Sequence, residues 1–388
     1  MRRAAVICLV VLTGQVAVGC SAVNGDAPPP PVIRVSPAFD TARARPDQAL
    51  VVRAKGGTLR TVRVYAAGAQ VPGVLDKAGR TWRSSWTLTP GAEYSVTATA
   101  ASGDGPATMA VGRFRTRAAK RTFGLRATTP LPGETVGVGM PIILDFDTPI
   151  LDKAAVERAL EVRAASPVEG AWRWTSDTQA VYRTRSYWPA RQAVTVTAHL
   201  AGVRAASGVY GTVNRSFAFT VGREQISSID TRTHQMVVSR DQRARKRMAI
   251  SAGMATTREY TTTSGVHLTM DKGNPVRMIS PGRVKGEPGF YDLLIDYAVR
   301  ISNSGEYVHA RDNVWAQGRA NVSHGCINAR PDQAAWFYTT SLRGDPVTIT
   351  GTTRALEWNN GWGFWQLPWD EWRLGSALHN PVQAGLER

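Results

Sequence analysis

The hexapeptide Ser323-His324-Gly325-Cys326-Ile327-Asn328 is the most distinctive stretch of the chain, because it places a cysteine beside a glycine and a histidine. Upstream, His309 ends the strand-like run Glu306-Tyr307-Val308-His309. A thiol is mostly protonated at neutral pH and needs a base or a positive neighbour to act as a nucleophile. His309 is the candidate base. The glycine lets the peptide groups around Gly325-Cys326 approach a substrate as oxyanion donors. The pattern therefore predicts a Cys/His nucleophile site.

The imidazole of His309 also needs a partner that fixes its tautomer. Glu306 is the carboxylate that flanks it in the sequence, and a backbone carbonyl is the alternative. The residues alone leave this choice open.

The N-terminus predicts export. Arg2 and Arg3 form a positive region, residues 4–12 are apolar but too short to span a bilayer, and Ala17-Val18-Gly19-Cys20 follows. The small residues before Cys20 resemble a bacterial lipobox. That resemblance implies a signal peptide over residues 1–20 and lipidation of the Cys20 thiol. The alternative is an ordinary signal peptide that is cut nearby, and both interpretations place the mature protein outside the cell membrane.

The chain has three cysteines, Cys8, Cys20 and Cys326. Cys8 lies in the segment that would be removed and Cys20 would carry the lipid, so Cys326 remains as the single thiol without a disulfide partner. A buried, inert cysteine is the usual structural explanation for such a residue. The polar neighbours Ser323 and Asn328 favour an exposed loop instead, and therefore a functional thiol.

The formal net charge of +17 predicts attraction to a polyanion, such as nucleic acid, an anionic membrane surface or an anionic cell wall. Charge alone does not choose among these partners. The only tight basic run, Arg243-Ala244-Arg245-Lys246-Arg247, is expected to form a solvated turn between two strands. HExxH, paired CxxC, glycine-rich phosphate-loop and EF-hand patterns are absent from the sequence, so no metal, nucleotide or other cofactor is predicted.

The chain is predicted to be mainly β, with two immunoglobulin-like sandwiches ahead of a β-rich catalytic domain. Residues 21–34 include a run of prolines and form a stiff linker. Residues 35–118 and 119–222 carry alternating or β-branched runs punctuated by Gly and Pro, which is typical of sandwiches. One short helix capped by Asp152 is expected in the second sandwich. Neither sandwich shows a pattern that points to chemistry.

Residues 223–351 are β-rich as well, and the segments 236–239 and 247–251 predict a hairpin. One main helix is expected to start at Pro331, directly after the cysteine loop, with Ala335, Trp336 and Tyr338 facing inward.

Residues 352–388 contain five tryptophans. A segment this aromatic is expected to fold back onto the catalytic domain as a C-terminal subdomain with a short helix from Pro368. A surface that stacks on glycans is the alternative for these tryptophans.

The hexapeptide at 323–328, with Tyr307-Val308-His309 upstream, resembles the catalytic signature of the L,D-transpeptidases, whose catalytic domain is of the YkuD type. The order of lipoprotein signal, two Ig-like domains, catalytic domain and Trp-rich tail is similar to that of the actinobacterial, mycobacterial-type members. The segment Leu367-Pro368-Trp369-Asp370-Glu371-Trp372 resembles their C-terminal subdomain. The resemblance extends over nearly the full chain.

This resemblance implies residue roles. Cys326 is the nucleophile, His309 is the base, and the backbone carbonyl of Ala310 orients the imidazole. His324 and Gly325 complete the catalytic set. The implied substrate-binding residues are Met278 and Tyr291 of a substrate-covering lid, Ser304 and Gly305 before the histidine strand, Ser323 and Asn328.

The resemblance also implies the reaction, a two-step acyl transfer between peptidoglycan stem peptides. Cys326 attacks the carbonyl of the third-position diamino acid, meso-diaminopimelate, in a tetrapeptide donor, and the terminal D-Ala leaves. The side-chain amine of a second stem then attacks the thioester and forms a 3→3 cross-link. Carbapenem β-lactams are expected to inhibit covalently. The enzyme is expected to be lipid-anchored at the cell membrane, to face the wall and to bind no nucleic acid.

Two other classes compete with this interpretation. A non-catalytic wall-binding lipoprotein would use the sandwiches and tryptophans, but it has no need for His309 together with Cys326. A sortase or another cysteine peptidase would lack the Ser-His-Gly-Cys arrangement, and a sortase would carry an arginine after the cysteine within a strand. Here Arg330 lies beyond Asn328, at the expected start of the helix.

Overall fold

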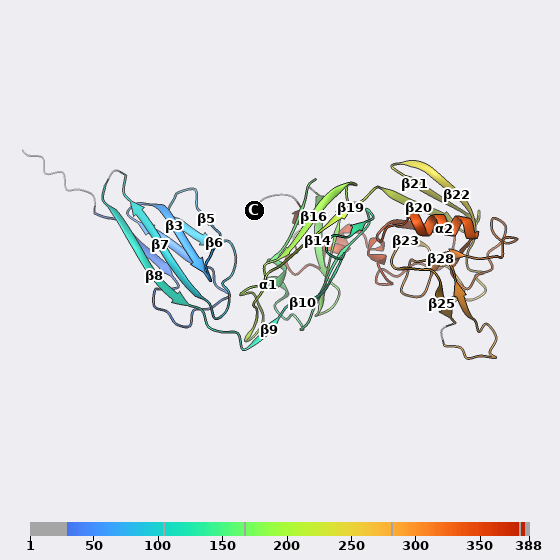
Figure 1. The fold of residues 1–388 in the computed structure, drawn as a ribbon, viewed down its shortest axis with the longest axis horizontal. Helices are drawn as coiled ribbons and strands as arrows, with labels where there is room; N and C mark the ends of the chain where they lie inside the picture. The colour runs from blue at the N-terminus through green and yellow to red at the C-terminus, as the bar shows by residue number, and fades with distance from the viewer. Residues whose placement is uncertain (1–28, 104, 167, 281, 380–381, 385–388) are drawn as a thin grey trace, which may run out of the picture.

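The computed structural model describes residues 29–103, 105–166, 168–280, 282–379 and 382–384. Three β-rich bodies follow one another along the long axis of the molecule (Figure 1). The predicted fold class is confirmed: the chain is mainly β, and two sandwiches precede a third domain that is built on a mixed sheet. The predicted signal peptide and the lipidation of Cys20 lie outside the described residues. Among the residues described, no helix is both long and apolar enough to cross a membrane.

The first sandwich consists of two four-stranded sheets, ordered β1-β2-β6-β5 and β4-β3-β7-β8. Buried and less buried residues alternate along β7, as expected for a strand with one face on a core. That core contains Leu50, Val52, Trp82 and Phe114. The strands are β1 (Val32–Ser36), β2 (Val51–Lys55), β3 (Thr58–Ala66), β4 (Ala69–Gln70), β5 (Gly73–Leu75), β6 (Thr81–Ser84), β7 (Glu93–Ala101) and β8 (Ala107–Arg115).

The second sandwich packs the sheet β10-β12-β15-β14-β31 against β11-β19-β16-β13, with a small sheet β17-β18-β9 at the side. Asp152 caps α1 as predicted, because its side chain accepts a hydrogen bond from the Ala155 amide at 3.2 Å. The elements are β9 (Arg121–Phe123), β10 (Leu125–Thr129), β11 (Thr135–Val136), β12 (Ile142–Phe146), α1 (Lys153–Glu157), β13 (Leu160–Ala164), β14 (Val168–Trp174), β15 (Gln179–Thr184), β16 (Gln192–Ala198), β17 (Arg204–Ala206), β18 (Val209–Gly211), β19 (Arg215–Val221) and β31 (Val382–Ala384).

The third body is organised by a nine-stranded sheet, ordered β23-β30-β20-β21-β22-β29-β28-β27-β24, with the hairpin β25-β26 beside it. The helix α2 follows β29 directly, as predicted from Pro331. The elements are β20 (Gln225–Asp230), β21 (Gln235–Arg240), β22 (Arg243–Ser251), β23 (Gly265–Leu268), β24 (Lys272–Gly273), β25 (Val276–Ile279), β26 (Asp292–Ile295), β27 (Ala298–Arg300), β28 (Tyr307–Ala310), β29 (Ile327–Ala329), α2 (Pro331–Thr340) and β30 (Pro346–Thr350).

One prediction within this body is wrong and one is incomplete. The basic run 243–247 is not a turn but the first half of β22, and the turn is made by Asp241 and Gln242, both at positive φ. The residues that α2 buries fully are Ala334 and Phe337, which lie three apart on one helix face. The predicted inward face is right in part, because Trp336 and Tyr338 are partly buried and pack against the same core.

The tail connects two domains, so the expectation that it folds onto the catalytic domain is only partly right. Its elements are the 3-10 helix η1 (Gly363–Gln366), the helix α3 (Trp369–Arg373) predicted from Pro368, and β31, which pairs with β14 of the second sandwich. Trp372 is fully buried and donates from Nε1 to the carbonyl of Ala171 at 3.0 Å. Gln366 accepts from the Val266 amide of the catalytic domain at 2.7 Å.

Burial also decides against the glycan-stacking alternative for the tail. Trp362 and Trp372 lie in the core that the tail shares with the second sandwich, and the other three tryptophans of the tail pack against this core. Rings that are covered by protein on this scale are not available as a stacking platform.

Candidate active site

The loop that carries Cys326 is fixed by its own polar groups. Cys326 stands directly before β29, and the backbone of Ser323 pairs with Gly253 on the neighbouring segment. The Ser323 hydroxyl donates to the carbonyl of Cys326 at 2.6 Å and accepts from the Gly325 amide at 3.1 Å. Ser323 thus closes a tight turn around the thiol, and its hydroxyl is already engaged on both sides.

Gly325 has φ +123°, a region that side chains disfavour, so a glycine is needed at this point of the turn. Its carbonyl accepts from the Thr262 hydroxyl at 2.8 Å, and Thr262 accepts in turn from the Gly253 amide at 2.9 Å. Sequence reasoning missed Thr262. Because the Gly325 amide donates to Ser323, it is not free to act as an oxyanion donor, contrary to the expectation for the peptide groups at 325–326.

His309 is brought to the cysteine by parallel pairing of β28 with β29, in which His309 lies opposite Asn328 and Val308 opposite Ile327. Its Nδ1 lies 2.8 Å from the carbonyl oxygen of Ala310. A carbonyl can only accept, so Nδ1 carries the proton and Nε2 of the neutral ring has a free lone pair. Of the two candidates that could orient the imidazole, Glu306 and a backbone carbonyl, it is therefore the carbonyl of Ala310 that contacts Nδ1.

Burial keeps both the His309 imidazole and the Cys326 thiol neutral. Burial lowers the pKa of His309 to about 4, and the hydrogen bond to Ala310 opposes this only in part. Burial raises the pKa of the Cys326 thiol to about 12, and the nearby Glu306 carboxylate acts in the same direction. The thiol donates weakly to the carbonyl of Gly305, at 3.6 Å from Sγ. At neutral pH the pair is a thiol and a neutral imidazole, which suits proton transfer during attack.

Two cavities meet at Cys326. One has a volume of about 340 Å³ and the other about 240 Å³. Met278, Tyr291, His324 and Cys326 line both of them. Among the other residues predicted from the sequence, the larger cavity is lined by Ser304, Gly305 and Gly325, and the smaller one by His309, Ser323 and Asn328. The fold thus gathers these residues around the thiol, with Ala310 behind the imidazole.

The hairpin β25-β26 lies over the site. Tyr291 stacks on the ring of His324, with ring centroids 5.3 Å apart and an interplanar angle of 5°, and Tyr260 contacts that imidazole at 4.5 Å. Burial and then the proximity of Cys326 raise the pKa of Tyr291, so its hydroxyl keeps its proton. Arg283 in the connecting loop pairs with Glu259 at 3.0 Å, which attaches the loop to the far rim of the larger cavity.

The buried carboxylate of Glu306 has a role that sequence reasoning missed. It accepts from the Thr263 amide at 2.7 Å and from the Thr263 hydroxyl at 2.8 Å, and His267 lies 2.8 Å from the same hydroxyl and 3.7 Å from Glu306. Burial alone would raise the pKa of Glu306, but the hydrogen bonds from His267 and Thr263 hold it below its usual range. His267 is fully buried in this cluster.

The tail reaches the rim of the larger cavity through Asn360. Its amide oxygen accepts from the Ser304 amide at 2.9 Å, and its nitrogen donates to the Ser304 hydroxyl at 2.9 Å. The turn at 302–305, which leads into the histidine strand, is therefore held by a residue that follows it by more than fifty positions. No local pattern in the sequence marks such a contact.

Comparisons with known proteins agree with this geometry. The family model for the L,D-transpeptidase catalytic domain matches residues 224–349, and that for the bacterial Ig domain matches residues 41–204. L,D-transpeptidase 5 of Mycobacterium tuberculosis is 34% identical over 92% of this chain and 79% of its own length. L,D-transpeptidase 2 of the same species is also 34% identical, over 85% of this chain and 81% of its own.

A solved structure adds a match in three dimensions. The structure of LD transpeptidase LdtMt1 in complex with imipenem is 32% identical and aligns with a TM-score of 0.51. The alignment covers 58% of this chain and 99% of that one.

Proposed function

Because the chain belongs to the L,D-transpeptidase family and is an enzyme that acts on peptidoglycan, we propose that it forms 3→3 cross-links through a thioester on Cys326. The observation that carries this proposal is the parallel pairing that puts His309, with Nε2 unprotonated, beside the cysteine loop. The donor is a tetrapeptide stem, and the acceptor is the side-chain amine of meso-diaminopimelate in a second stem.

The first step is acylation. As Sγ of Cys326 attacks the carbonyl carbon of the third residue, its proton passes to Nε2 of His309. The bond between this carbonyl and the D-Ala nitrogen then breaks, and the imidazolium returns the proton to the departing amine. The products are a thioester on Cys326 and free D-Ala.

The second step reverses these roles. The acceptor amine attacks the thioester and gives a proton to His309, and the cysteine leaves with a proton and is regenerated. The departing and the attacking amine both exchange a proton with the same nitrogen, so they occupy the same place in turn.

The two cavities provide room for the two peptides. His309 lines the smaller cavity and not the larger, so D-Ala departs there and the acceptor amine enters there, beside Asn328. The donor stem lies in the larger cavity, along Ser304 and Gly305. Met278 and Tyr291 of the lid lie above both peptides.

The oxyanion that forms during both steps needs donors other than the Gly325 amide. The Cys326 amide and the Tyr291 hydroxyl are the groups that we assign to this role. Tyr291 suits it because its raised pKa keeps the donor proton in place next to the thiol.

Purified protein and disaccharide-tetrapeptide test this proposal. The expected products are free D-Ala and a dimer whose fragment masses place the bond between two third-position residues. Cys326→Ala should give neither product. A product mixture that contains tripeptide but no dimer would reduce the function to carboxypeptidase activity, and a 4→3 dimer would contradict the proposed donor.

The same proposal includes inhibition and location. The structure of the relative LdtMt1 is a complex with imipenem, and we infer that carbapenems acylate Cys326 in this chain. We further propose that Cys20 is lipidated and that residues 21–34 hold the body away from the cell membrane. The boundaries at residues 118, 222 and 351 belong to this proposal. Cys20→Ala should move the protein from the membrane fraction to the soluble fraction, and unchanged membrane retention would contradict the anchor.

A further inference from the structure

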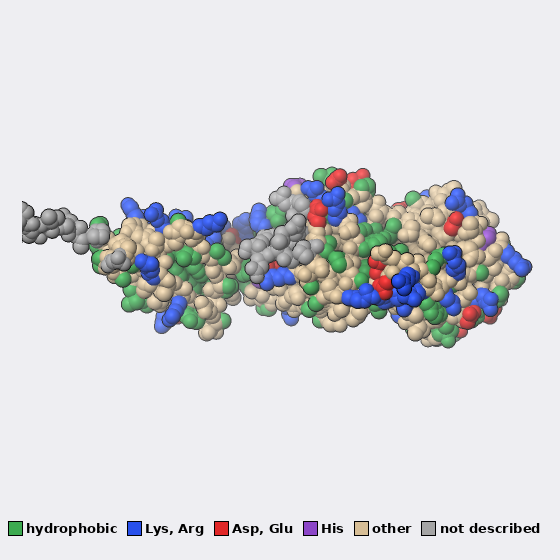
Figure 2. All heavy atoms as spheres, turned by 90° about the horizontal axis from the view of Figure 1, so that it is seen from above, with side chains coloured by type: hydrophobic (Ala, Val, Ile, Leu, Met, Phe, Trp, Pro, Cys, Tyr) green, Lys and Arg blue, Asp and Glu red, His purple; other side chains and the backbone are tan. Residues whose placement is uncertain are grey.

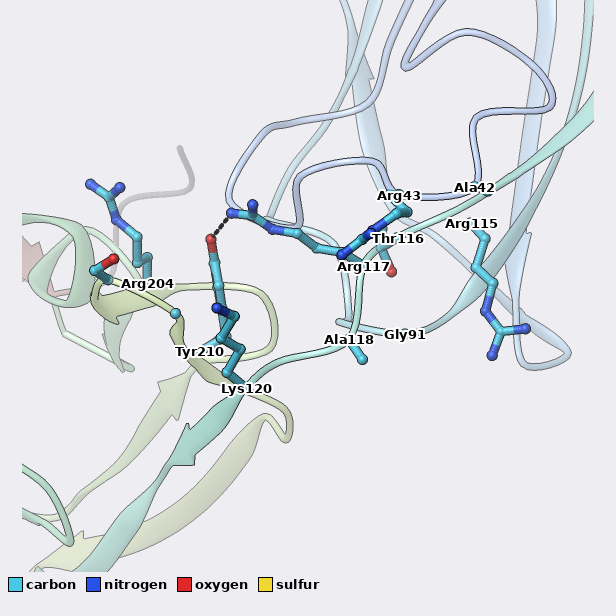
Figure 3. Close-up of a pocket in the computed structure, with 12 residues that line it drawn as sticks. Ala42, Arg43, Gly91, Arg115, Thr116, Arg117, Ala118, Lys120, Arg204 and Tyr210 are labelled. Carbon is cyan, nitrogen blue, oxygen red and sulfur yellow. Dashed lines mark hydrogen bonds between the residues drawn. The ribbon is translucent and has the colours of Figure 1, made fainter.

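A cavity of about 540 Å³ lies between the two sandwiches, in parts of the chain that the proposed reaction does not use (Figure 3). Cationic side chains enter it from both sides of the junction. Arg43, Arg115 and Arg117 come from the first sandwich, Lys120 from the connection and Arg204 from the second sandwich.

The charge in this cavity is poorly balanced. Within the described residues, the lining includes no Asp or Glu, and of the five cations only Arg204 forms an ion pair, with Asp152 at 3.2 Å. Like charges that line one cavity repel one another, and a bound anion relieves this repulsion. Lys and Arg side chains are spread over many parts of the surface (Figure 2), but here five of them line one partly open cavity.

One of the cations is held in place by the second sandwich. Arg117 donates to the hydroxyl of Tyr210, and its guanidinium lies 5.4 Å from the centre of that ring. Tyr210 is buried, and its hydroxyl lies 3.5 Å from Asp47, which pairs with Arg45 at 2.7 Å. A guanidinium fixed by such contacts loses little side-chain entropy when an anion binds. Arg43, Arg115 and Lys120 remain exposed and free to contact a ligand.

The arrangement of the cations suggests the form of the ligand. Arg204 and Arg115 lie at opposite sides of the group, with Arg117 and Arg43 between them (Figure 3). An extended chain with repeated single charges fits this row better than one compact anion. Guanidinium groups donate two parallel hydrogen bonds to phosphate oxygens, and four of the five cations are arginines. Small residues on the rim, Gly91, Ala118 and Gly208, leave room for such a chain.

We propose that this cavity, named the junction groove, binds a linear polyanion through its phosphodiester groups. Binding there would attach the enzyme to the envelope at a place separate from the active site at Cys326. Linear chains of phosphodiesters occur in wall polymers, and single phosphodiesters occur in anionic lipid headgroups, so the test includes vesicles as the competing source.

The test compares two triple variants of the full chain. In the groove variant Arg43→Gln, Arg115→Gln and Lys120→Gln are combined. The control variant combines Arg243→Gln, Arg245→Gln and Arg247→Gln, which are exposed on β22 of the catalytic domain. Both variants lower the net charge by three. A difference in their affinities therefore reflects where the charges were removed, and not the total charge. A third variant, with Arg43→Lys, Arg115→Lys and Lys120→Arg, keeps the charge of the groove.

Binding is measured by calorimetry with poly(glycerol phosphate), with polyglutamate of equal charge, and with phosphatidylcholine vesicles with or without phosphatidylglycerol. We expect the groove variant to bind a phosphodiester probe at least about tenfold more weakly, because each lost charged hydrogen bond contributes substantially. The control variant should change by less than about twofold. The charge-keeping variant should bind more tightly than the groove variant but more weakly than the wild type, because lysine keeps the charge and loses the two parallel hydrogen bonds of the guanidinium. All variants should retain transpeptidase activity on a soluble substrate, which also shows that they fold.

Each outcome decides the proposal. Loss of poly(glycerol phosphate) binding that is confined to the groove variant supports it, whereas binding of phosphatidylglycerol vesicles without binding of the polymer would overturn it. Equal loss in the groove and control variants would show attraction by net charge and overturn it. Unchanged binding in the groove variant, or equally tight binding of polyglutamate, would overturn it as well.

Discussion

The two walls that face Cys326 are built differently. On one side, β28 and β29 are inner strands of the nine-stranded sheet, and His309 and Asn328 are only 5% and 4% exposed. On the other side, β25 and β26 form a separate two-stranded sheet, and the large side chains Ile279 and Leu294 are 48% and 71% exposed. A small, exposed hairpin is marginally stable by itself and opens more easily than an inner strand.

This difference assigns separate tasks to the two walls. Proton transfer demands fixed geometry, and the inner strands supply it through backbone pairing and the Ala310 carbonyl. In the proposed reaction two peptides enter and one cross-linked product leaves, which requires a lid that can open. Changes in the sheet wall should therefore affect the chemical step and the fold, and changes in the lid should affect mainly substrate binding.

The largest effect is expected for His309→Gln. Loss of the base should slow acylation of Cys326 by a carbapenem by about a thousandfold, within the usual range for general acid–base catalysis. The measurement is stopped-flow absorbance, with His379→Gln, a change at an exposed histidine of the tail, as the control. If the rate of acylation falls by less than about tenfold, the base is not His309 and does not come from the sheet wall.

Glu306→Gln tests the buried support of the same wall. The amide would place a donor against Thr263, which already donates, so the free energy of unfolding should fall by about 2 kcal/mol. The matched change Glu287→Gln, at an exposed residue of the lid, should alter it by less than about 0.5 kcal/mol. Chemical denaturation of the full chain measures both values. Equal effects would remove the contrast between the walls.

Met278→Ala tests the lid. The side chain lines both cavities, so its loss should raise KM for the tetrapeptide about tenfold through lost apolar contact and leave kcat within about twofold. Leu294→Ala removes a similar volume from the same hairpin, at a residue outside both linings, and should leave KM unchanged. A fall in kcat with unchanged KM would place Met278 in the chemical step instead.

The smallest effect is expected for pH. A histidine with its ordinary pKa would be about 3% neutral at pH 5, whereas His309, with its pKa lowered to about 4, stays about 90% neutral. Since the neutral form is the base, acylation should change by less than about 1.5-fold between pH 7 and pH 5 and fall only as pH drops toward 4. A decline centred near pH 6.5 would show that the imidazole is not buried as described.

Local sequence signals predicted most of the elements of this architecture, but few of the contacts between residues that are far apart in the chain. Alternation and turn residues located the strands, Pro331 marked the start of α2, and a short motif paired Cys326 with His309. The tail could not be placed in this way, because Trp372 packs against a strand of the second sandwich about two hundred residues earlier in the chain. Such a contact leaves no periodic trace in either segment.

The same limit applies around the thiol. Glu306 was available as a candidate orienter of His309, but its true partners, Thr263 and His267, lie on another segment of the sheet. The basic run at 243–247 was assigned to a turn because charged residues favour exposure, yet the exposed face of a strand satisfies them equally well. Charge indicates exposure, and backbone pairing decides the element.

The nucleophile is the central claim, and intact-protein mass spectrometry after incubation with a carbapenem tests it most directly. Wild-type protein should gain the mass of one inhibitor, and peptide mapping should place the adduct on Cys326. Cys326→Ala should gain no mass under the same conditions. An adduct that persists in Cys326→Ala, or that maps to another residue of the wild type, would contradict the account.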